Sequence, residues 1–312
     1  MKQVHLESLL ANSLLKDTCP TAESIDPGAI SKFTSKHAFP KDMPTTDYVE
    51  YIPGNFPLVI SASHGGYLDP AEFPERRKSP NASLLGDLHT QEIARLLVEY
   101  LGDMGKRPYL VICHLRRSKV DMNRRPGSLA YDNTKAAEVY FKYHARLSQA
   151  CEEIQNLYGT GIYLDIHGQR HPQNWIELGY LLNSSELEHT DQELDSYAGP
   201  FSLSRLLARH PNTKIGELLR GDESFGGLLE SLGYKTVPSP QHPSPSSEKY
   251  YRGGYCTYRY WKVGGLDTLQ VELPASIRFD LGNRKKFIRD LAQVILGFGN
   301  RWYEWNRITS KI

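Results

Sequence analysis

Two apolar stretches of the chain end in the same way, with a histidine followed by glycine. Residues 57–60 (Pro-Leu-Val-Ile) lead into Ser-Ala-Ser-His64-Gly-Gly, and residues 162–166 (Ile-Tyr-Leu-Asp-Ile) lead into His167-Gly. Short apolar runs bounded by turn residues are typical of buried strands, and open α/β sheets bind ligands where their strands end. We therefore expect His64 and His167 to face each other at one edge of a sheet. The alternative is that each is a hydrogen-bonded loop residue.

The segments between and after these strands alternate between helix and strand patterns. Apolar residues recur at helical spacing from about Asp87 to Asp103 and from about Asn133 to Tyr158, where the apolar face extends to Leu157. A C-terminal helix is expected to carry one apolar stripe of Phe287, Ile288, Leu291, Ile295, Phe298 and Trp302. Further apolar strands are expected at Arg107–His114, Trp175–Leu182 and Leu269–Leu273. Strands alternating with helices predict an α/β fold with a parallel sheet.

The remaining segments lack a sustained period. Residues 1–50 are expected to form an N-terminal extension packed on a single domain of residues 51–312. Residues 67–86 form a loop that is long for a compact domain, and because such loops usually border a site, we expect it to be one wall of a cleft. Residues 193–232 indicate short helices joined by loops, and the proline-rich residues 238–247 indicate a rigid surface loop.

Composition narrows the classes of partner. The 312 residues carry 37 Lys and Arg against 36 Asp and Glu, a net charge of +1, so the chain has no general attraction for nucleic acid or for an anionic membrane. Its 4 cysteines are widely spaced, which favours reduced thiols in a cytoplasmic protein over a disulfide framework. No apolar run reaches the roughly 20 residues that a membrane-spanning helix needs.

The two histidines suggest a metal site. A catalytic zinc ion takes three protein ligands from His, Asp or Glu and keeps one position open. His64 and His167 supply two, and the third is expected to be a carboxylate. Asp87, at the start of the helix after the long loop, is the first candidate, with Glu72 and Asp69 as rivals. Aspartate is also a favoured helix N-cap, which gives Asp87 an alternative role without a metal.

Two further carboxylates interrupt apolar strands. Asp165 lies two residues before His167, so the two side chains share one face of a strand and Asp165 can orient the histidine from outside the ligand shell. Glu272 lies in Leu-Gln-Val-Glu-Leu, and a buried carboxylate is costly unless the site uses it. We expect Glu272 to be a general base. The alternative is an edge strand with Glu272 facing water.

A cluster of basic residues follows the strand that ends at His114. Five of the ten residues from 116 to 125 are Lys or Arg, which places several guanidinium groups at a strand end, where they can hold a carboxylate. Asn123 and Arg124 pair an amide donor with a cation. The alternative for the other arginines is a solvated basic loop, and a nucleic-acid patch is disfavoured by the near-zero net charge.

Five short motifs, in this order, resemble those of the N-formylglutamate amidohydrolase family. They are Ser63-His64-Gly65-Gly66, Arg117-Ser118-Lys119-Val120-Asp121-Met122-Asn123-Arg124, Asp165-Ile166-His167-Gly168, Gly253-Gly254-Tyr255 and Leu269-Gln270-Val271-Glu272. The resemblance covers residues 55–300 or so. It implies a zinc hydrolase with a carboxypeptidase-like α/β fold, in which a central mixed, mainly parallel sheet of about eight strands is flanked by helices.

The resemblance also implies roles for single residues. His64 and His167 would bind one Zn²⁺, and Glu272 would act as general base and acid. The residues implied in substrate binding are Asn123, Arg124, Gly253, Gly254 and Tyr255, and Arg116 or Arg117 would polarise the substrate carbonyl. One position departs from the wider pattern, because zinc carboxypeptidases carry Glu three residues after the first histidine and this chain has Tyr67 there. The third ligand therefore stays open, with Asp87 as the first candidate.

The expected function is that of a zinc-dependent amidohydrolase. It would cleave the amide bond of a small N-acyl amino acid, for example an N-formyl amino acid, or of an acidic peptide with a free carboxylate, by metal-activated water. One alternative is a carboxypeptidase-like or poly-glutamate peptidase that uses the same site. Another is a binding protein without a metal that holds an anionic metabolite through Arg124. The sequence does not indicate an oligomeric state.

Overall fold

A seven-stranded mixed sheet forms the centre of the protein in a computed structural model that describes residues 47–80, 82–127 and 129–308. The strand order is β1-β3-β2-β4-β7-β5-β6, and four of the six neighbouring pairs are parallel. The strands are β1 Val49–Ile52, β2 Leu58–Ala62, β3 Tyr109–Cys113, β4 Ile162–Gly168, β5 Ile176–Gly179, β6 Thr236–Val237 and β7 Asp267–Leu273. The predicted α/β class with a mainly parallel sheet is confirmed, with seven strands in the described chain where about eight were expected.

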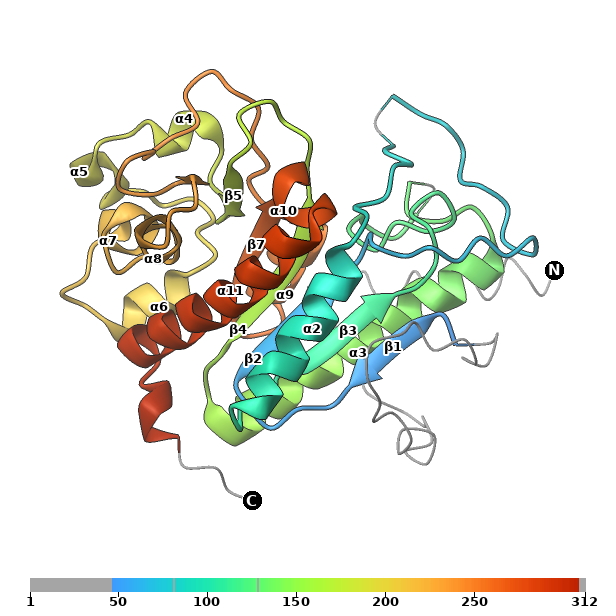
Figure 1. The fold of residues 1–312 in the computed structure, drawn as a ribbon, viewed down its shortest axis with the longest axis horizontal. Helices are drawn as coiled ribbons and strands as arrows, with labels where there is room; N and C mark the ends of the chain where they lie inside the picture. Colours follow the sequence, from blue (N-terminus) through green and yellow to red (C-terminus); the bar gives the residue numbers. More distant parts are fainter. Residues whose placement is uncertain (1–46, 81, 128, 309–312) are drawn as a thin grey trace.

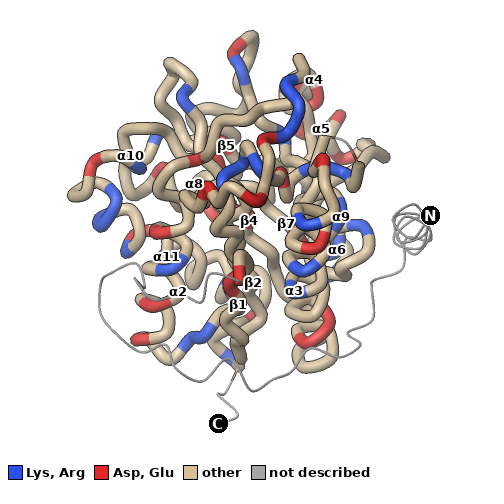
Figure 2. The backbone as a smooth tube through the Cα atoms, turned by 90° about the vertical axis from the view of Figure 1, so that its right-hand side faces the viewer, with Lys and Arg blue, Asp and Glu red and all other residues tan. Residues whose placement is uncertain are grey.

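Helices cover both faces of this sheet. Figures 1 and 2 show α2 (Thr90–Asp103) and α11 (Leu281–Trp302) side by side on one face, with α3 (Thr134–Tyr158) and α9 (Tyr255–Lys262) on the other. The short α10 (Ala275–Phe279) follows β7 directly. The predicted helical region is confirmed as α5 Asp191–Leu194, α6 Ser204–Arg209, α7 Ile215–Arg220 and α8 Phe225–Ser231, preceded by α4 Ser184–Leu187. A 3-10 helix, η2 (Trp305–Arg307), ends the described chain.

Strand β1 overlaps the end of the predicted N-terminal extension. Most of the extension, residues 1–46, lies outside the described residues. Val49 and Glu50, however, belong to β1, which pairs antiparallel with β3 and is the edge strand of the sheet. The main body therefore begins before residue 51. No helix of the described chain combines the length and the apolar character that crossing a bilayer requires.

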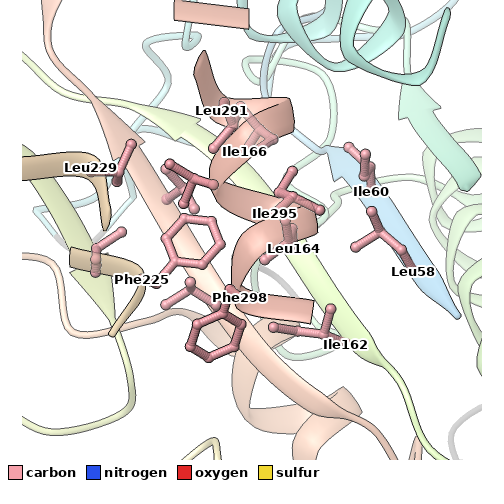
Figure 3. Close-up of a cluster of buried hydrophobic side chains, with 14 of the residues drawn as sticks. Leu58, Ile60, Ile162, Leu164, Ile166, Phe225, Leu229, Leu291, Ile295 and Phe298 are labelled. Atoms are coloured by element: carbon pink, nitrogen blue, oxygen red, sulfur yellow. The ribbon is translucent and has the colours of Figure 1, made fainter. Parts of the chain in front are cut away.

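The core explains why the strands read as continuous apolar runs. Alternate residues of β2 face opposite sides, so Leu58 and Ile60 pack in the larger hydrophobic cluster while Val59 packs in the other. Figure 3 shows Leu164 of β4 beside the apolar stripe of α11, where Ile295 and its neighbours lie. Because helices cover both faces, every residue of β2 is buried.

One helix position departs from the predicted packing face. Leu157, near the end of α3, has 64% of its surface exposed, although the next residue, Tyr158, still packs against the smaller hydrophobic cluster. The contrast with the sheet gives a stability prediction. Leu164→Ala should lower the free energy of unfolding by about 2–5 kcal/mol, since it leaves a cavity, while Leu157→Ala should change it by less than about 0.5 kcal/mol. Urea denaturation of both variants measures the difference, and equal effects would contradict the assignment of the core.

The parallel strands bring their carboxyl ends to one edge. Register pairs Ser61 of β2 with Asp165 of β4, and His167 of β4 with Glu272 of β7. Residue 64, two positions beyond β2, emerges at the same edge. The sheet thus places the two histidines and the glutamate, which are far apart in sequence, on adjacent strands.

Candidate active site

Three buried side chains converge where β2 and β4 end. The Nδ1 atom of His64 lies 3.3 Å from the Asp87 Oδ2 atom, and the Nδ1 atom of His167 lies 2.9 Å from the same oxygen. One ligand atom from each residue falls within 4.8 Å of the other two, a spacing that can hold a metal ion. The two imidazole rings have centroids 4.8 Å apart. The structure therefore brings together the two histidines and the carboxylate that the sequence analysis put first.

The turn after β2 is built by close backbone contacts. A Cβ atom on Gly66 would lie 2.2 Å from the Leu115 carbonyl oxygen, and one on Gly65 would lie 2.5 Å from the Thr90 hydroxyl. Only glycine allows such an approach. The Asp87 amide donates a 2.9 Å hydrogen bond to the carbonyl oxygen of His64, which ties the two candidate ligands through the backbone.

Asp87 does not act as a helix cap, and its two rivals as third ligand lie away from the histidines. Helix α2 begins at Thr90, and its N-cap residue is His89, so the Asp87 side chain does not cap the helix. Asp69 instead forms ion pairs with Lys119 and Arg116 at 2.7 and 2.8 Å. Neither Asp69 nor Glu72 belongs to the cluster of candidate metal ligands.

Glu72, the second rival, accepts a 2.8 Å hydrogen bond from the Tyr48 hydroxyl in an exposed position. Both rivals thus lie on the loop after the first histidine without reaching the site. Asp87 comes closer because the loop returns to the sheet at its far end, next to the start of α2.

Each histidine contacts a second carboxylate through its Nε2 atom. The Nε2 atom of His64 lies 2.7 Å from Asp121 Oδ1, and that of His167 lies 2.9 Å from Asp165 Oδ2. The Ser61 hydroxyl donates a 2.6 Å hydrogen bond to the other oxygen of Asp165. Metal-binding histidines almost always use their second nitrogen in this way. Both Nδ1 atoms are thereby left to face Asp87.

Asp121 is one of the residues to which the sequence analysis gave no role. It is fully buried, and although burial opposes its charge, the nearby His64 and Arg117 hold its pKa well below the usual range. The signal was present, because Asp121 stands between the apolar Val120 and Met122, both of which are buried. Because basic residues surround Asp121, the sequence analysis assigned this segment to substrate binding instead.

These outer carboxylates give a prediction for metal affinity. Asp165→Asn and Asp121→Asn should each weaken metal binding about 10- to 100-fold, because the amide supports the imidazole less well than a carboxylate does. Competition with a chromophoric zinc chelator measures the dissociation constant. Glu153→Gln on α3, where the carboxylate accepts a hydrogen bond from Gln149, is the matched control and should leave the constant unchanged. Wild-type affinity in both aspartate variants would contradict the geometry.

Glu272 lies beside the cluster on an internal strand. Strand β7 is flanked by β4 and β5, so the alternative of an edge strand facing water is wrong. The amide of Gln270 donates a 3.0 Å hydrogen bond to Glu272 Oε1, while the buried Oε2 atom has no hydrogen-bond partner among the described residues. Burial raises the pKa of Glu272 to about 8, which suits a group that exchanges protons near neutral pH.

A second buried glutamate lies across from Glu272. Glu177 of β5 is its partner in the ladder, yet its oxygens already accept hydrogen bonds from the Trp175 indole at 3.2 Å and from the Tyr251 amide at 2.8 Å. His171 Nδ1 adds a 2.7 Å contact. Sequence reasoning overlooked Glu177, although it interrupts an apolar strand just as Glu272 does. Its saturated contacts indicate a structural role.

The basic segment divides into residues at the site and residues away from it. The Nε atom of Arg117 lies 3.0 Å from Asp121 Oδ2, and its Nη1 atom lies 3.9 Å from Asp87 Oδ1. Arg124 reaches Asp121 at 3.8 Å and remains partly exposed. Arg116 points to an exposed carboxylate on the long loop, and Arg125 lies over the Tyr258 ring. Of the two arginines considered for carbonyl polarisation, Arg117 is the one beside the candidate metal ligands.

The remaining candidates for substrate binding, Asn123 and residues 253–255, line the cleft. The side-chain oxygen of Asn123 accepts a 2.7 Å hydrogen bond from the Cys256 amide, and the Gly254 amide donates to Gln270 at 2.8 Å. A Cβ atom on Gly254 would lie 2.2 Å from the Asn123 amide nitrogen, so glycine is needed there. These contacts brace the start of α9 against the site. They leave Arg124 more available to a ligand than Asn123.

The candidate active site opens into one large cleft of about 1770 Å³. Ordinary small-molecule pockets measure about 300–1,000 Å³. Carboxylates on its wall are Glu75, Asp87 and Glu272, and they are outnumbered by the cationic side chains Arg116, Arg117, Arg124, Arg125, Arg170, Lys249, Arg252 and Arg278. The cleft is therefore suited to an anionic ligand.

Comparison with known proteins identifies solved structures that are similar to this chain. No protein-family model matches the sequence. No curated protein gives a significant match. Among solved structures, N-formylglutamate amidohydrolase from Ralstonia eutropha JMP134 matches with a TM-score of 0.51 at 17% identity, over 83% of this chain and 99% of that one. A gene product from Agrobacterium tumefaciens matches with a TM-score of 0.50 at 14% identity, over 82% and 96% of the two chains.

A bacteriophage poly-gamma-glutamate hydrolase also matches, with a TM-score of 0.39 at 12% identity over 84% of this chain and 93% of that one, but this similarity is too distant to carry an argument. The other two similarities span nearly the whole of each neighbour. The described chain therefore has the fold of the Ralstonia N-formylglutamate amidohydrolase.

Proposed function

We propose that the protein is a zinc-dependent hydrolase that cleaves an amide bond in an anionic substrate, either an N-acyl amino acid or an acidic peptide with a free carboxylate. The observation that carries the proposal is the arrangement of His64, Asp87 and His167 around one point, with Glu272 beside them on the adjacent strand. The shared fold with an amidohydrolase agrees with this proposal.

The residues present fit a catalytic zinc ion. Two histidines and one carboxylate are a common donor set for such sites. The Nδ1 atom of His64 is buried and forms no hydrogen bond within the described residues, although Asp87 Oδ2 lies 3.3 Å away, as expected of a nitrogen and a carboxylate that share a ligand. His64, His167 and Asp87 would hold the metal, which supplies a water molecule of lowered pKa and polarises the amide carbonyl.

The chain's own groups complete the chemistry. Glu272, whose Oε2 atom is unpartnered within the described chain, would take a proton from water and deliver it to the leaving amine. Arg117 would donate to the carbonyl oxygen of the scissile amide as negative charge develops there. Arg124, the more exposed arginine, would hold the substrate carboxylate.

The size of the cleft supports a second candidate function, in which the substrate is a longer acidic chain. A cleft of about 1770 Å³ exceeds what a single formyl amino acid would fill, and its cationic side chains extend beyond Arg124 to Lys249 and Arg252. A peptidase acting on acidic chains, using the same ligands and the same glutamate, is therefore the second candidate function.

Metal analysis followed by a substrate screen tests the proposal. About one zinc ion per chain and turnover that a chelator abolishes and zinc restores are the expected results. The screen compares N-formyl and N-acetyl amino acids with acidic peptides of two to six residues, and kcat/KM that rises with peptide length would select the peptidase. A protein that binds these anions but holds no metal and turns over no amide would instead be a binding protein.

A further inference from the structure

One buried arginine hydrogen-bonds to three separate segments beneath the site. Arg278 of α10 is 2% exposed, and its guanidinium donates to backbone carbonyl oxygens from three of its nitrogen atoms. Nε donates to Leu273 at 3.0 Å, Nη1 to Leu88 at 2.7 Å, and Nη2 to Gln169 at 2.9 Å. The planar fork of a guanidinium fixes the directions of these donors relative to one another.

Each of these carbonyls belongs to a segment that carries a residue of the proposed chemistry. The first follows Glu272 by one residue, the second follows Asp87 by one, and the third follows His167 by two. Glu272 lies on β7, Asp87 on the loop before α2, and His167 on β4. Within the described chain, Arg278 thus connects the proposed base with two of the three proposed metal ligands.

The position of the guanidinium is defined closely by the chain around it. A Cβ atom on Gly168 would lie 2.4 Å from the Arg278 Nε atom and 2.5 Å from its Cζ atom, so the glycine after His167 leaves just enough room. The arginine reaches this place because α10 turns the chain back immediately after β7. The charge of Arg278 also lies near Asp87 and Glu272.

We propose that Arg278 is a positioning residue that holds Asp87, His167 and Glu272 at their mutual distances. The part of this inference that concerns metal affinity rests on the proposed function, while the part that concerns the imidazole of His167 does not. Lysine cannot replace Arg278, because an ammonium group is a point charge that cannot direct three donors to three fixed carbonyls in one plane.

The test compares Arg278→Met and Arg278→Lys with a matched control. Arg220 of α7 also donates to two backbone carbonyls, those of Leu187 and His189 at 2.9 and 2.7 Å, but it does not line the cleft. Arg220→Met therefore removes backbone hydrogen bonds away from the site, together with the ion pair that Arg220 forms with Asp191 at 2.6 Å. Gly168→Ala is a further variant that displaces the guanidinium while leaving Arg278 in place.

Two measurements are made on folded protein, with thermal unfolding to establish the folded fraction. Zinc affinity, by chelator competition, should fall about 10- to 100-fold in the Arg278 and Gly168 variants and stay unchanged in Arg220→Met. The imidazole ¹⁵N signals of His167 in metal-free, histidine-labelled protein should shift in the same variants and not in the control. If Arg278→Met does not fold, Arg278→Lys and Gly168→Ala decide the question.

The outcomes separate the two proposals. If wild-type protein binds no zinc, the proposed function fails, and the His167 signals still decide whether Arg278 positions the site. If wild-type protein binds zinc and the Arg278 variants keep both its affinity and the His167 signals, the positioning role is overturned and the proposed function stands. A loss of thermal stability equal to that of Arg220→Met, with no other change, would likewise overturn the positioning role.

Discussion

Glu272→Gln should lower kcat by about 10²- to 10⁴-fold while the protein keeps its metal. The substitution preserves the shape of the side chain but removes the group that would exchange protons with water and with the leaving amine. The Glu272 carboxylate is not among the three groups that could hold the metal, so the metal content should not change. Steady-state kinetics with the best substrate from the screen, together with metal analysis of the same sample, measures both quantities.

The neighbouring glutamate supplies the control for this prediction. Glu177→Gln changes a carboxylate that is equally buried and lies across the ladder from Glu272, but one whose oxygens already accept hydrogen bonds from the protein and do not line the cleft. Glu177→Gln should lower the free energy of unfolding, and it should lower kcat much less than Glu272→Gln does. Unchanged turnover in Glu272→Gln would refute the proposed role, and equal losses of turnover in the two variants would indicate that burial of negative charge matters more than proton transfer.

Asp87→Ala should abolish tight metal binding and, with it, turnover. Among the described residues, its Oδ2 atom is the carboxylate oxygen that both Nδ1 atoms of the histidine pair approach, so without it only two imidazoles would remain for a divalent cation. Metal-free wild-type protein, prepared with a chelator, should regain activity when zinc is added. Metal-free Asp87→Ala should not. Metal analysis after dialysis and the recovery of activity provide the two measurements.

The rival carboxylates make this prediction specific. Asp69→Ala and Glu72→Ala remove acidic groups from the same loop, but these groups form surface contacts with Arg116, Lys119 and Tyr48. Both variants should therefore bind zinc as the wild type does. Loss of zinc from either of them, with Asp87→Ala unaffected, would move the third ligand to the loop and contradict the observed cluster.

Much of the architecture could be predicted from local patterns. Residues around His64 and His167 show apolar runs that end in turn residues, and this pattern depends only on neighbours in the chain. The long helices are read from the spacing of apolar residues in the same way, although the start of α2 lies three residues after the predicted Asp87. Leu157 shows the limit, because the spacing of apolar residues does not reveal which of them the neighbouring elements leave exposed.

The amino-acid sequence was enough to predict the α/β class, the two histidines at strand ends and a carboxylate that interrupts an apolar strand at position 272, because strand and turn formation leave a mark on adjacent residues. The burial of Glu272 followed only from the strand order, which places β7 between β4 and β5. The choice of Asp87 over Asp69 and Glu72, the contact of Asp121 with His64 and the hydrogen bonds of Arg278 to three segments of the site required the folded chain. These contacts join residues that lie far apart in the chain, and they depend on strand order and register. A one-dimensional pattern carries no record of which strand ends become neighbours in space.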